Sequence, residues 1–441
     1  MTIWVDNSKC LVTEYTQEEY VNLKNLMSYY IDQPGSYSAR KWGPKKKSLL
    51  KKNGSKGSTF PTGLLYIARK AYPEASVHDL RTLPPKIDYP VFKLPVTPYK
   101  AQLAVVRACK TNSRGIVVAP TGTGKSIMLA MMIKEISRPT MVVVPTLELK
   151  RQLTESLVSI FGSKYVGPNR KITVDNIDSL DPSIKSHYDC VIIDEFHHSG
   201  ADSYRKMNEL SWTNVYFKYG LTATPFRSQD NEKLLLESVL SEVIYKVEYK
   251  DAVESKLIVP MEAYYITVPK KKDVKGMMWQ EIYKELVVFN EERNALVSLF
   301  ITMAQHTNKS TLVLVKEIAH GEILAKTTGA PFANGLADDT KDLIRSFSAK
   351  EIPVLIGTTG VLGEGIDTKP AEYIVIAGLG KSKNSIMQQI GRGFRNYPGK
   401  TSCKIVLFKD LSHKWTIGHY REQCKILKTE YGALPIQLEI V

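Results

Sequence analysis

The sequence predicts an α/β protein in which a small basic α+β domain precedes two tandem parallel-sheet domains. Three observations support this fold class: a length of 441 residues allows two or three domains, short apolar runs alternate with amphipathic segments, and cations are concentrated in one N-terminal stretch. We expect the domains at residues 1–92, 93–250 and 259–441, with residues 251–258 as a linker.

The expected first domain carries a strongly basic segment. Ten Lys and Arg and no Asp or Glu lie between Ser36 and Tyr72, in a chain whose net charge is +15. Aromatic residues are interleaved with these cations, and this combination favours contact with the phosphates and bases of a nucleic acid. The alternative is a solvated basic surface. The lysines that we expect to bind nucleic acid are Lys45, Lys46, Lys47, Lys51 and Lys52.

Spacing and turn residues predict the local elements. Apolar residues at helical spacing predict a helix over Tyr15–Ile31, and Thr62 is the expected N-cap of a helix that ends near Tyr72. Gly43-Pro44 predicts the turn of a hairpin over Ser36–Leu50. In the later domains, apolar runs predict strands at 115–119, 141–144, 191–193, 217–221, 312–315, 353–357 and 373–377.

Composition argues against several classes of protein. The five cysteines are scattered without a Cys-x-x-Cys pair, so we expect no zinc site, iron–sulfur cluster or disulfide framework. No apolar run approaches about 18 residues, and the N-terminus lacks the layout of a signal peptide. We therefore expect an intracellular, cytoplasmic protein and, because no repeat or coiled-coil pattern is present, a monomer.

A phosphate-binding loop is predicted at Ala119-Pro-Thr-Gly-Thr-Gly-Lys-Ser126, between an apolar strand and a helix over 126–136. Its glycines allow backbone N–H groups to face phosphate oxygens, Lys125 reaches the β- and γ-phosphates, and Ser126 offers a hydroxyl to Mg²⁺. The N-terminus of the helix favours the same anions. The residues expected at the phosphates are Thr121, Gly122, Thr123, Gly124, Lys125 and Ser126.

An acidic pair is expected to complete this site. Asp194 and Glu195 follow the apolar run Cys190–Ile193, at the strand end where α/β sheets place ligands. Asp194 is expected to bind Mg²⁺ together with Ser126, and Glu195 is expected to polarise the attacking water. The alternative, a surface acidic pair after a strand, is weakened by the presence of the phosphate loop. The sequence therefore predicts an enzyme that hydrolyses a nucleoside triphosphate with Mg²⁺ as cofactor.

Further motifs follow these two in order: Leu221-Thr-Ala-Thr-Pro225, Ile356-Gly-Thr-Thr359 with Gly363-Glu-Gly-Ile-Asp367, and Gln388-Gln-Ile-Gly-Arg-Gly-Phe-Arg395. With them the chain resembles the superfamily 2 helicases of the Asp-Glu-x-His type over roughly residues 95–400. The resemblance implies two RecA-like domains, ATP and Mg²⁺ as cofactors, and an ATPase that is coupled to movement on nucleic acid.

The resemblance also implies roles at the nucleotide. Tyr99 is expected to stack on adenine and Gln102 to recognise it, while Gly365 and Asp367 are expected to contact the ribose. The catalytic residues expected in the last motif are Gln388, Arg392 and Arg395. The resemblance implies that Arg392 and Arg395 are arginine fingers, which accelerate hydrolysis by about 10³–10⁵-fold in well-studied nucleotidases.

Contacts to nucleic acid and coupling roles are implied in the same way. The expected nucleic-acid contacts are Thr146 and Asn176 in the first helicase domain and Thr358 and Thr359 in the second. The residues expected to couple hydrolysis to strand movement are His197, Thr222 and Thr224, with Gln388 as the partner of His197 or of the γ-phosphate.

Within the superfamily the chain is similar to the UvsW-like phage helicases. The similarity rests on Asp194-Glu-Phe-His197, Asn290-Glu-Glu-Arg-Asn294 and Phe60-Pro-Thr-Gly-Leu-Leu65. It implies a DNA helicase or translocase that unwinds or branch-migrates forks and four-way junctions in recombination, repair or replication. The implied partner is branched DNA, and the implied setting is a prokaryotic or phage-infected cell.

Three alternative functions stay open at this point: an RNA helicase, a duplex DNA translocase that never separates strands, and a nucleic-acid-binding protein that has lost its ATPase. Intact Lys125, Asp194 and Glu195 argue against the last of these. A further hypothesis places a strand-separating wedge at residues 269–279, and its alternative is a solvated loop that leads to a Trp279 anchored in the core.

Overall fold

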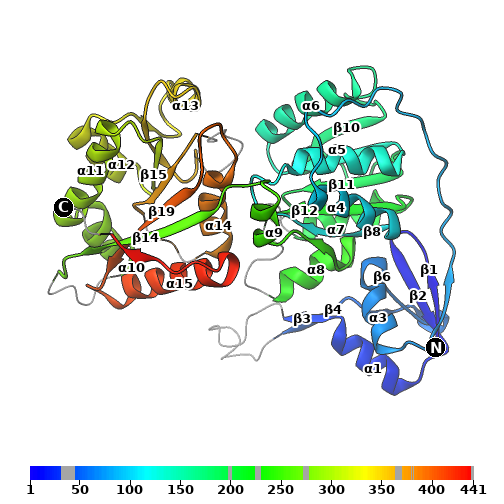
Figure 1. Cartoon of the computed structure of the whole chain (residues 1–441). Helices are drawn as coiled ribbons and strands as arrows, with labels where there is room; N and C mark the ends of the chain where they lie inside the picture. Colours follow the sequence, from blue (N-terminus) through cyan, green and yellow to red (C-terminus); the bar gives the residue numbers. More distant parts are fainter. Residues whose placement is uncertain are drawn as a thin grey trace. The chain divides into compact units, whose positions relative to one another are not determined.

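The computed structural model describes residues 1–30, 45–196, 201–223, 230–271, 278–362, 370–378, 380 and 382–438. The chain divides into two compact units, one of Met1–Ala119 with Lys125–Val247 and the other of Pro120–Gly124 with Glu248–Val441 (Figure 1). Each unit contains a parallel sheet, which confirms the predicted α/β fold class. Within the described part of the chain, no helix has the length and apolar character needed to cross a membrane.

A mixed five-stranded sheet begins the first unit. Its order is β5 (Lys51–Lys52), β6 (Ser58–Pro61), β2 (Lys9–Thr13), β1 (Thr2–Val5) and β7 (Ser76–Asp79), with β1 and β7 parallel and the other pairs antiparallel. The same region contains α1 (Gln17–Leu26), α3 (Leu65–Ala71) and an antiparallel pair of β3 (Ser28–Tyr30) with β4 (Lys46–Ser48). Short 3-10 turns lie at Gly54–Lys56 and Thr62–Leu64. This mixed sheet with helices confirms the predicted α+β character.

The structure confirms some of the elements predicted in this region and corrects others. Thr16 caps α1 through a capping box with Glu19, and β3 follows the helix closely, so α1 is shorter than the expected Tyr15–Ile31. The second helix is confirmed, but Thr62 opens a 3-10 turn that leads into α3 and does not cap it. The expected hairpin over Ser36–Leu50 falls partly outside the described residues, and its strand β4 pairs with β3, which precedes that range.

Six parallel strands form the second sheet of the first unit, in the order β10 (Ile172–Asn176), β9 (Thr140–Val144), β11 (Cys190–Asp194), β12 (Phe217–Thr222), β8 (Arg114–Val118) and β13 (Val243–Lys246). Its helices are α4 (Lys100–Thr111), α5 (Lys125–Ile136) and α6 (Leu147–Phe161), which pack in sequence, and α7 (Ala201–Leu210) and α8 (Asp230–Leu240), which pack on each other. The central strands are buried almost throughout, as expected for a parallel sheet between helices. The strands predicted in this region are confirmed, and β10 and β13 are additional.

Seven parallel strands form the sheet of the second unit, in the order β16 (Phe332–Ala333), β17 (Val354–Thr358), β15 (Thr311–Val315), β18 (Tyr373–Ile376), β19 (Cys403–Asp410), β14 (Met261–Val268) and β20 (Ile436–Gln437). Its helices are α9 (Tyr249–Glu254), α10 (Trp279–Tyr283), α11 (Glu291–His306), α12 (Ile318–Thr328), α13 (Thr340–Ser348), α14 (Lys383–Gly391) and α15 (Lys414–Tyr431), with a π-helical turn at Lys284–Val288 and a 3-10 turn at Arg392–Phe394. The strands predicted in this region are confirmed. Part of the segment expected as a linker is α9, and buried Leu257, Ile258 and Val259 follow it.

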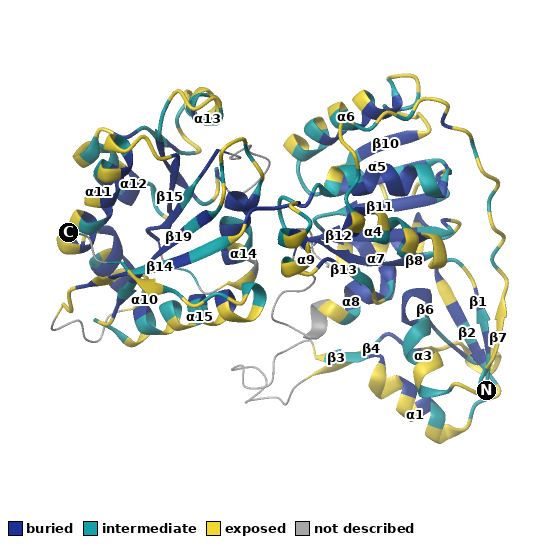
Figure 2. Ribbon diagram, in the orientation of Figure 1, coloured by how far each residue is buried: buried dark blue, intermediate teal, exposed yellow. Residues whose placement is uncertain are grey.

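The N-terminal sheet shares one apolar core with the parallel sheet of the first unit. Ile3, Phe60 and Leu64 belong to the same buried cluster as Val191 and Trp212. Figure 2 colours the buried residues of both sheets dark blue. One continuous core implies that the two sheets behave as one body, since separating them would expose apolar surface to water. The boundary expected at residue 92 stays a prediction about sequence organisation.

Close backbone and polar contacts reinforce this shared core. Gly63 packs against α8 so tightly that an added Cβ would lie 2.1 Å from the Glu237 carbonyl oxygen. Tyr66 Oη donates a hydrogen bond of 2.7 Å to Glu237 Oε2. Burial raises the pKa of both groups, so Tyr66 keeps the proton that it donates to Glu237.

Two buried cations meet at one carbonyl of the N-terminal sheet. Lys218 Nζ and Arg114 Nη2 donate to the Asn7 carbonyl oxygen, at 2.8 and 3.0 Å. Lys218 Nζ also donates to Asn208 Oδ1 at 2.7 Å. Burial holds the pKa of Lys218 well below its usual value and lowers that of Arg114 to about 10. The N-terminal region is therefore fixed to β12 and β8 by directional bonds as well as by apolar packing.

Candidate active site

The loop between β8 and α5 has the backbone of a phosphate-binding turn. Its helix begins at Lys125, one residue before the expected start. Gly122 and Gly124 have φ values of +90° and +74°, which residues with a side chain rarely adopt. The Thr123 N–H and hydroxyl both donate to the Pro120 carbonyl oxygen, at 3.3 and 2.7 Å. The expected strand, tight turn and helix are all present.

Lys125 and Glu195 form the central ion pair of the site. Lys125 Nζ lies 2.6 Å from Glu195 Oε1, and the two side chains are only 13% and 18% exposed. Thr222 Oγ1 donates to the other carboxylate oxygen of Glu195 at 3.4 Å. Glu195 has a φ of +49°, a strained conformation that is concentrated at functional sites. The structure thus brings together residues from three separate motifs.

Asp194 carries a carboxylate oxygen that suits a hard cation. Its Oδ1 is buried and makes no hydrogen bond within the described residues. Burial, with the charge of Glu195 second, raises the pKa of Asp194 to about 7, while Lys125 lowers it. Oxygen donors of this kind fit Mg²⁺, and Ser126 at the start of α5 adds a hydroxyl. Among the described residues no group of three His, Cys, Asp or Glu is placed to hold a metal.

The residues expected at adenine lie at the start of α4. Tyr99 is the residue before the helix, and its N–H donates to Gln102 Oε1 at 3.0 Å. Gln102 is buried, so this side chain carboxamide is turned toward its own helix N-terminus. Adenine recognition by Tyr99 and Gln102 stays a prediction, as do the phosphate contacts of Thr121 and Ser126.

The expected catalytic residues of the last motif lie on α14 and the turn that follows it. Gln388 is half-buried on α14, Arg392 is buried, and Arg395 directly follows the 3-10 turn. An added Cβ at Gly393 would lie 2.0 Å from Cys403 Sγ, so only glycine allows the turn to pack on β19. Their action at the γ-phosphate stays a prediction.

Thr146 and Asn176 lie at the carboxyl ends of neighbouring strands, β9 and β10. Thr146 caps α6 by accepting a hydrogen bond from the Leu149 N–H at 3.3 Å. Asn176 is buried, and its Nδ2 donates to the Pro145 carbonyl oxygen at 2.9 Å while its Oδ1 accepts from the Asp178 N–H at 2.7 Å. Asn176 therefore holds the loop that presents Thr146, and a direct contact between Asn176 and nucleic acid stays a prediction.

The other expected nucleic-acid contacts differ in exposure. Thr358 is buried at the end of β17, and Thr359 is half-buried, with its N–H donating to the Val315 carbonyl oxygen at 2.8 Å. The predicted lysines of the first unit are all exposed on or beside β4 and β5, where Lys52 Nζ lies 4.9 Å from the centroid of the Tyr20 ring. These exposed lysines are Lys45, Lys46, Lys47, Lys51 and Lys52.

Some expected residues lie outside the described part of the chain. They are His197, Thr224, Gly365, Asp367, the cations Arg40 and Lys41, and residues 272–277 of the hypothetical wedge. Trp279, at the end of that segment, is described: it is half-buried and lies in an aromatic cluster with Tyr283, Trp415 and His419. This agrees with the simpler expectation of an anchored Trp279.

Sequence reasoning missed a cavity on the second unit that Trp279 lines together with Lys316, Trp415 and His419. One signal was available, because Lys316 directly follows the strand predicted at 312–315, where α/β sheets place ligands. Trp415 and His419 are spaced i and i+4 on a helix, which is equally typical of an ordinary core contact.

Two family models match the chain. One, described as "Type III restriction enzyme, res subunit", matches residues 95–227, and the other, described as "Helicase conserved C-terminal domain", matches residues 290–397. The first match covers β8 to β12 and the second covers β15 to β18, in the order of the motif series.

The chain is also similar to individual proteins that are named as helicases. The chain is 26% identical over 317 residues to the "Putative DNA 3'-5' helicase Rad25" of Halobacterium salinarum, a match that covers 67% of this chain but only 51% of that protein. It is 22% identical over 346 residues to the "ATP-dependent DNA helicase uvsW" of Enterobacteria phage T4, covering 70% of this chain and 68% of that one. The chain thus spans about half the length of the first of these relatives.

A solved structure shows the same fold. The ATP-dependent Type ISP restriction-modification enzyme LlaBIII, solved bound to DNA, aligns with a TM-score of 0.57 at 13% identity, covering 84% of this chain and 34% of that one.

Proposed function

We propose that this chain, which belongs to the superfamily 2 helicases, uses ATP hydrolysis to move along DNA and to unwind or branch-migrate forks and four-way junctions. The observation that carries the proposal is the group of Lys125, Glu195 and Thr222 beside Asp194, at the carboxyl edge of the first parallel sheet. This group combines a cation for phosphate, a carboxylate for water and a hydroxyl from the following motif.

Binding of ATP would change the partner of Lys125. Its ammonium lies against Glu195, and a γ-phosphate in the loop would compete for the same cation. Glu195 released from Lys125 would then be able to polarise the attacking water. Mg²⁺, held by Asp194 and Ser126 when bound, supplies charge neutralisation at the phosphates.

Thr222 offers a route from this exchange to strand movement. Its hydroxyl donates to Glu195, and it ends β12, which lies next to β11 in the sheet. A change in the position of the Glu195 carboxylate would therefore move Thr222 at the end of β12. Coupling through this loop is part of the proposal.

Each unit would offer the DNA its own contacts. Thr146 in the first unit and Thr359 in the second are half-buried, each follows the end of a parallel strand, and each would contact a phosphate of the DNA. The exposed lysines on or beside β4 and β5 would hold a duplex arm or junction, and the shared core makes them move together with the first parallel sheet.

The test is the rate of ATP hydrolysis with no nucleic acid, single-stranded DNA, linear duplex, fork, four-way junction and RNA. We expect forks and four-way junctions to stimulate most, together with conversion of labelled junctions into products. Equal or greater stimulation by RNA would contradict a DNA substrate. Stimulation by linear duplex with no strand displaced from any substrate would instead indicate a translocase that does not separate strands.

A further inference from the structure

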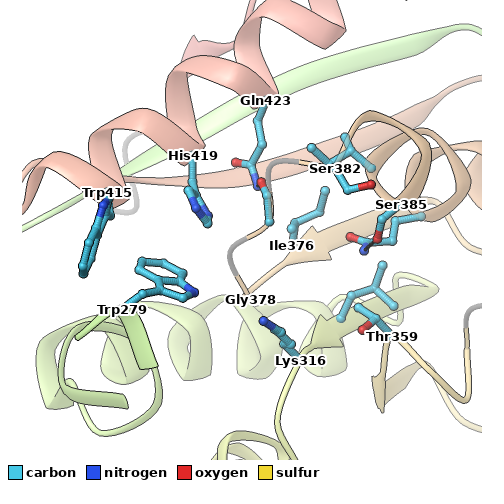
Figure 3. Close-up of a pocket in the computed structure, with 14 residues that line it drawn as sticks. Trp279, Lys316, Thr359, Ile376, Gly378, Ser382, Ser385, Trp415, His419 and Gln423 are labelled. Atoms are coloured by element: carbon cyan, nitrogen blue, oxygen red, sulfur yellow. Dashed lines mark hydrogen bonds between the residues drawn. The ribbon is translucent and has the colours of Figure 1, made fainter. Parts of the chain in front are cut away.

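A cavity of about 560 Å³ lies at the carboxyl edge of the second parallel sheet. It is lined from the ends of β15, β17 and β18 on one side and from α10, α14 and α15 on the others (Figure 3). Its volume falls in the range of about 300–1,000 Å³ that is usual for ligand pockets. All of its lining residues belong to the second unit, so it is a feature of that unit by itself.

One end of the cavity is aromatic. The rings of Trp279 and Trp415 are 5.6 Å apart at 88°, and those of Trp279 and His419 are 4.5 Å apart at 43°. All three side chains are half-buried, and Figure 3 shows their rings gathered at one end of the cavity. Rings held by one another in this way offer a planar ligand a preformed wall at little cost in side-chain entropy.

The other end of the cavity is polar and carries positive charge. The hydroxyls of Thr359, Ser382 and Ser385 lie there, with Lys316 between them and the rings (Figure 3). No acidic residue is among the described residues that line the cavity. Lys316 is exposed, makes no ion pair within the described residues, and its Nζ lies 5.3 Å from the centroid of the Tyr283 ring. An anion would therefore meet no opposing charge on this wall.

The helix that carries Trp279 is held by an unusual backbone turn. Residues Lys284–Val288 form a π-helical turn, a rare feature that is often found at functional sites. Asn290 Nδ2 and Asn294 Nδ2 donate to carbonyl oxygens within this turn, at 3.2 and 2.8 Å. Asn290 and Asn294 therefore hold the turn that follows the helix of Trp279, at the aromatic end of the cavity.

The middle of the Asn290–Asn294 motif fixes the opposite wall. Arg293 is fully buried, and its Nη2 donates to the Ala377 carbonyl oxygen at 2.7 Å. Its guanidinium carbon lies 4.9 Å from the centroid of the Phe408 ring. At the next residue, Gly378, an added Cβ would lie 3.1 Å from the Lys316 backbone nitrogen, so these two strand ends are in close contact. Both walls are thus set by packing and hydrogen bonds of the protein alone.

We propose that this cavity receives one unstacked nucleobase of the DNA strand that contacts the second unit. The base would lie against Trp279, Trp415 and His419, and its phosphate would face Lys316 and Thr359. An aromatic end joined to a cationic, hydroxyl-lined end matches the two parts of a nucleotide, and Thr359 belongs to the motif expected at the DNA backbone. The inference rests on the proposed DNA substrate and names where a base would be held.

The test compares an intact oligothymidylate with an abasic strand of the same length and phosphate count. Stacking on an aromatic side chain is worth enough that Trp415→Ala should lower the ratio of the two affinities by roughly tenfold. Tyr420→Ala is the matched control, because Tyr420 lies on the same helix but packs on Tyr265, away from the cavity. An unchanged ratio in Trp415→Ala, or an equal loss in Tyr420→Ala, would overturn the proposal.

A second measurement does not depend on a variant that folds. A strand containing 5-iododeoxyuridine should crosslink on irradiation of the wild-type chain to peptides that contain Trp279, Trp415 or His419. Crosslinks confined to other peptides would overturn the proposal.

These outcomes are separable from failure of the proposed function. A wild-type chain that binds neither strand and whose ATP hydrolysis does not respond to DNA would remove the DNA substrate itself. A wild-type chain that binds the intact and abasic strands equally well would leave the DNA substrate in place and refute only the base-binding cavity.

Discussion

The two parallel sheets carry very different groups at the same topological position. At the carboxyl edge of the first sheet lie a glycine turn, two carboxylates and a lysine that is paired with one of them. At the carboxyl edge of the second lie aromatic rings, hydroxyls and a lysine without an ion pair among the described residues. The first set suits the chemistry of phosphate transfer, and the second suits holding a ligand without reacting with it. The shared architecture therefore places ligands, while local side chains decide what is done to them.

Lys125→Ala should produce the largest effect and would show that ATP hydrolysis needs the lysine at the edge of the first sheet. Loss of the cation at the phosphates is expected to reduce kcat for ATP hydrolysis by at least about 10²–10³-fold. Binding of DNA should persist, because the exposed lysines and the second unit are untouched. Steady-state hydrolysis and fluorescence anisotropy measure the two properties.

The matched control is Lys110→Ala, which removes a lysine of an exposed ion pair with Glu135 in the same unit. Its hydrolysis rate should stay close to that of the wild type. Hydrolysis that survives Lys125→Ala would refute the active-site assignment.

Low pH should reduce the stability of the second unit, because His320 is buried in it. Its Nε2 lies 3.0 Å from Asn294 Oδ1, and burial, with the charge of Arg293 second, lowers its pKa to about 3. The unfolded value is about 6.5, so the unfolded state binds more protons between these pH values, and stability is lost as pH falls through this window. At pH 5 the loss is about 2 kcal/mol.

His320→Gln should remove this pH dependence, measured as the free energy of unfolding in urea at pH 7 and pH 5. His306→Gln is the control, because His306 is exposed at the end of α11. If the wild type and His320→Gln lose equal stability between the two pH values, His320 does not titrate as its burial requires.

The basic surface should respond to salt in a way that the cavity does not. Replacing Lys51 and Lys52 by Ala removes two exposed cations from β5. Each lysine that contacts a phosphate should reduce the slope of log Kd against log salt by about 1. Binding at a series of salt concentrations measures this slope, and Lys250→Ala, an exposed cation on α9, is the control. An unchanged slope in the double variant would favour the solvated-surface alternative.

Replacement of Thr146 should have the smallest effect. Two roles of this side chain can be separated: the N-cap of α6 and the expected contact with DNA. Thr146→Ala removes the N-cap of α6 and should cost about 1 kcal/mol of stability. Thr146→Ser keeps a capping hydroxyl and should restore both the stability and the affinity for single-stranded DNA. If Thr146→Ala lowers stability but leaves DNA affinity unchanged, Thr146 is only a cap. Thermal unfolding and anisotropy separate the roles.

Local patterns predicted much of this protein. Apolar runs predicted the strands around the active site, and the glycines of the phosphate loop predicted a tight turn, in which the structure gives Gly122 and Gly124 positive φ values. The contact between Glu195 and Thr222 is consistent with the order of the motifs, because Glu195 follows β11 and Thr222 ends β12, the adjacent strand of the same sheet. These features depend on residues close in sequence or on a known strand order.

The features that escaped prediction depend on contacts between distant residues. Nothing near Gly63 in the sequence indicates that α8 will pack on it. Asn290, Arg293 and Asn294 were recognised as a motif, but their use in fixing a π-helical turn and a strand end is visible only in three dimensions. The cavity likewise joins residues from five separate segments, which come together only in three dimensions.

The shared core of the first unit has a consequence for modularity. The N-terminal sheet covers Leu235, Leu236 and Val239 of α8, and it caps the buried Lys218 through Asn7. A chain shortened to begin at residue 93 would expose this apolar face and remove the Asn7 acceptor of Lys218, so it should aggregate and not survive as a minimal motor. The basic region is thus not a detachable accessory: exchanging it between relatives would require α8 to be exchanged with it.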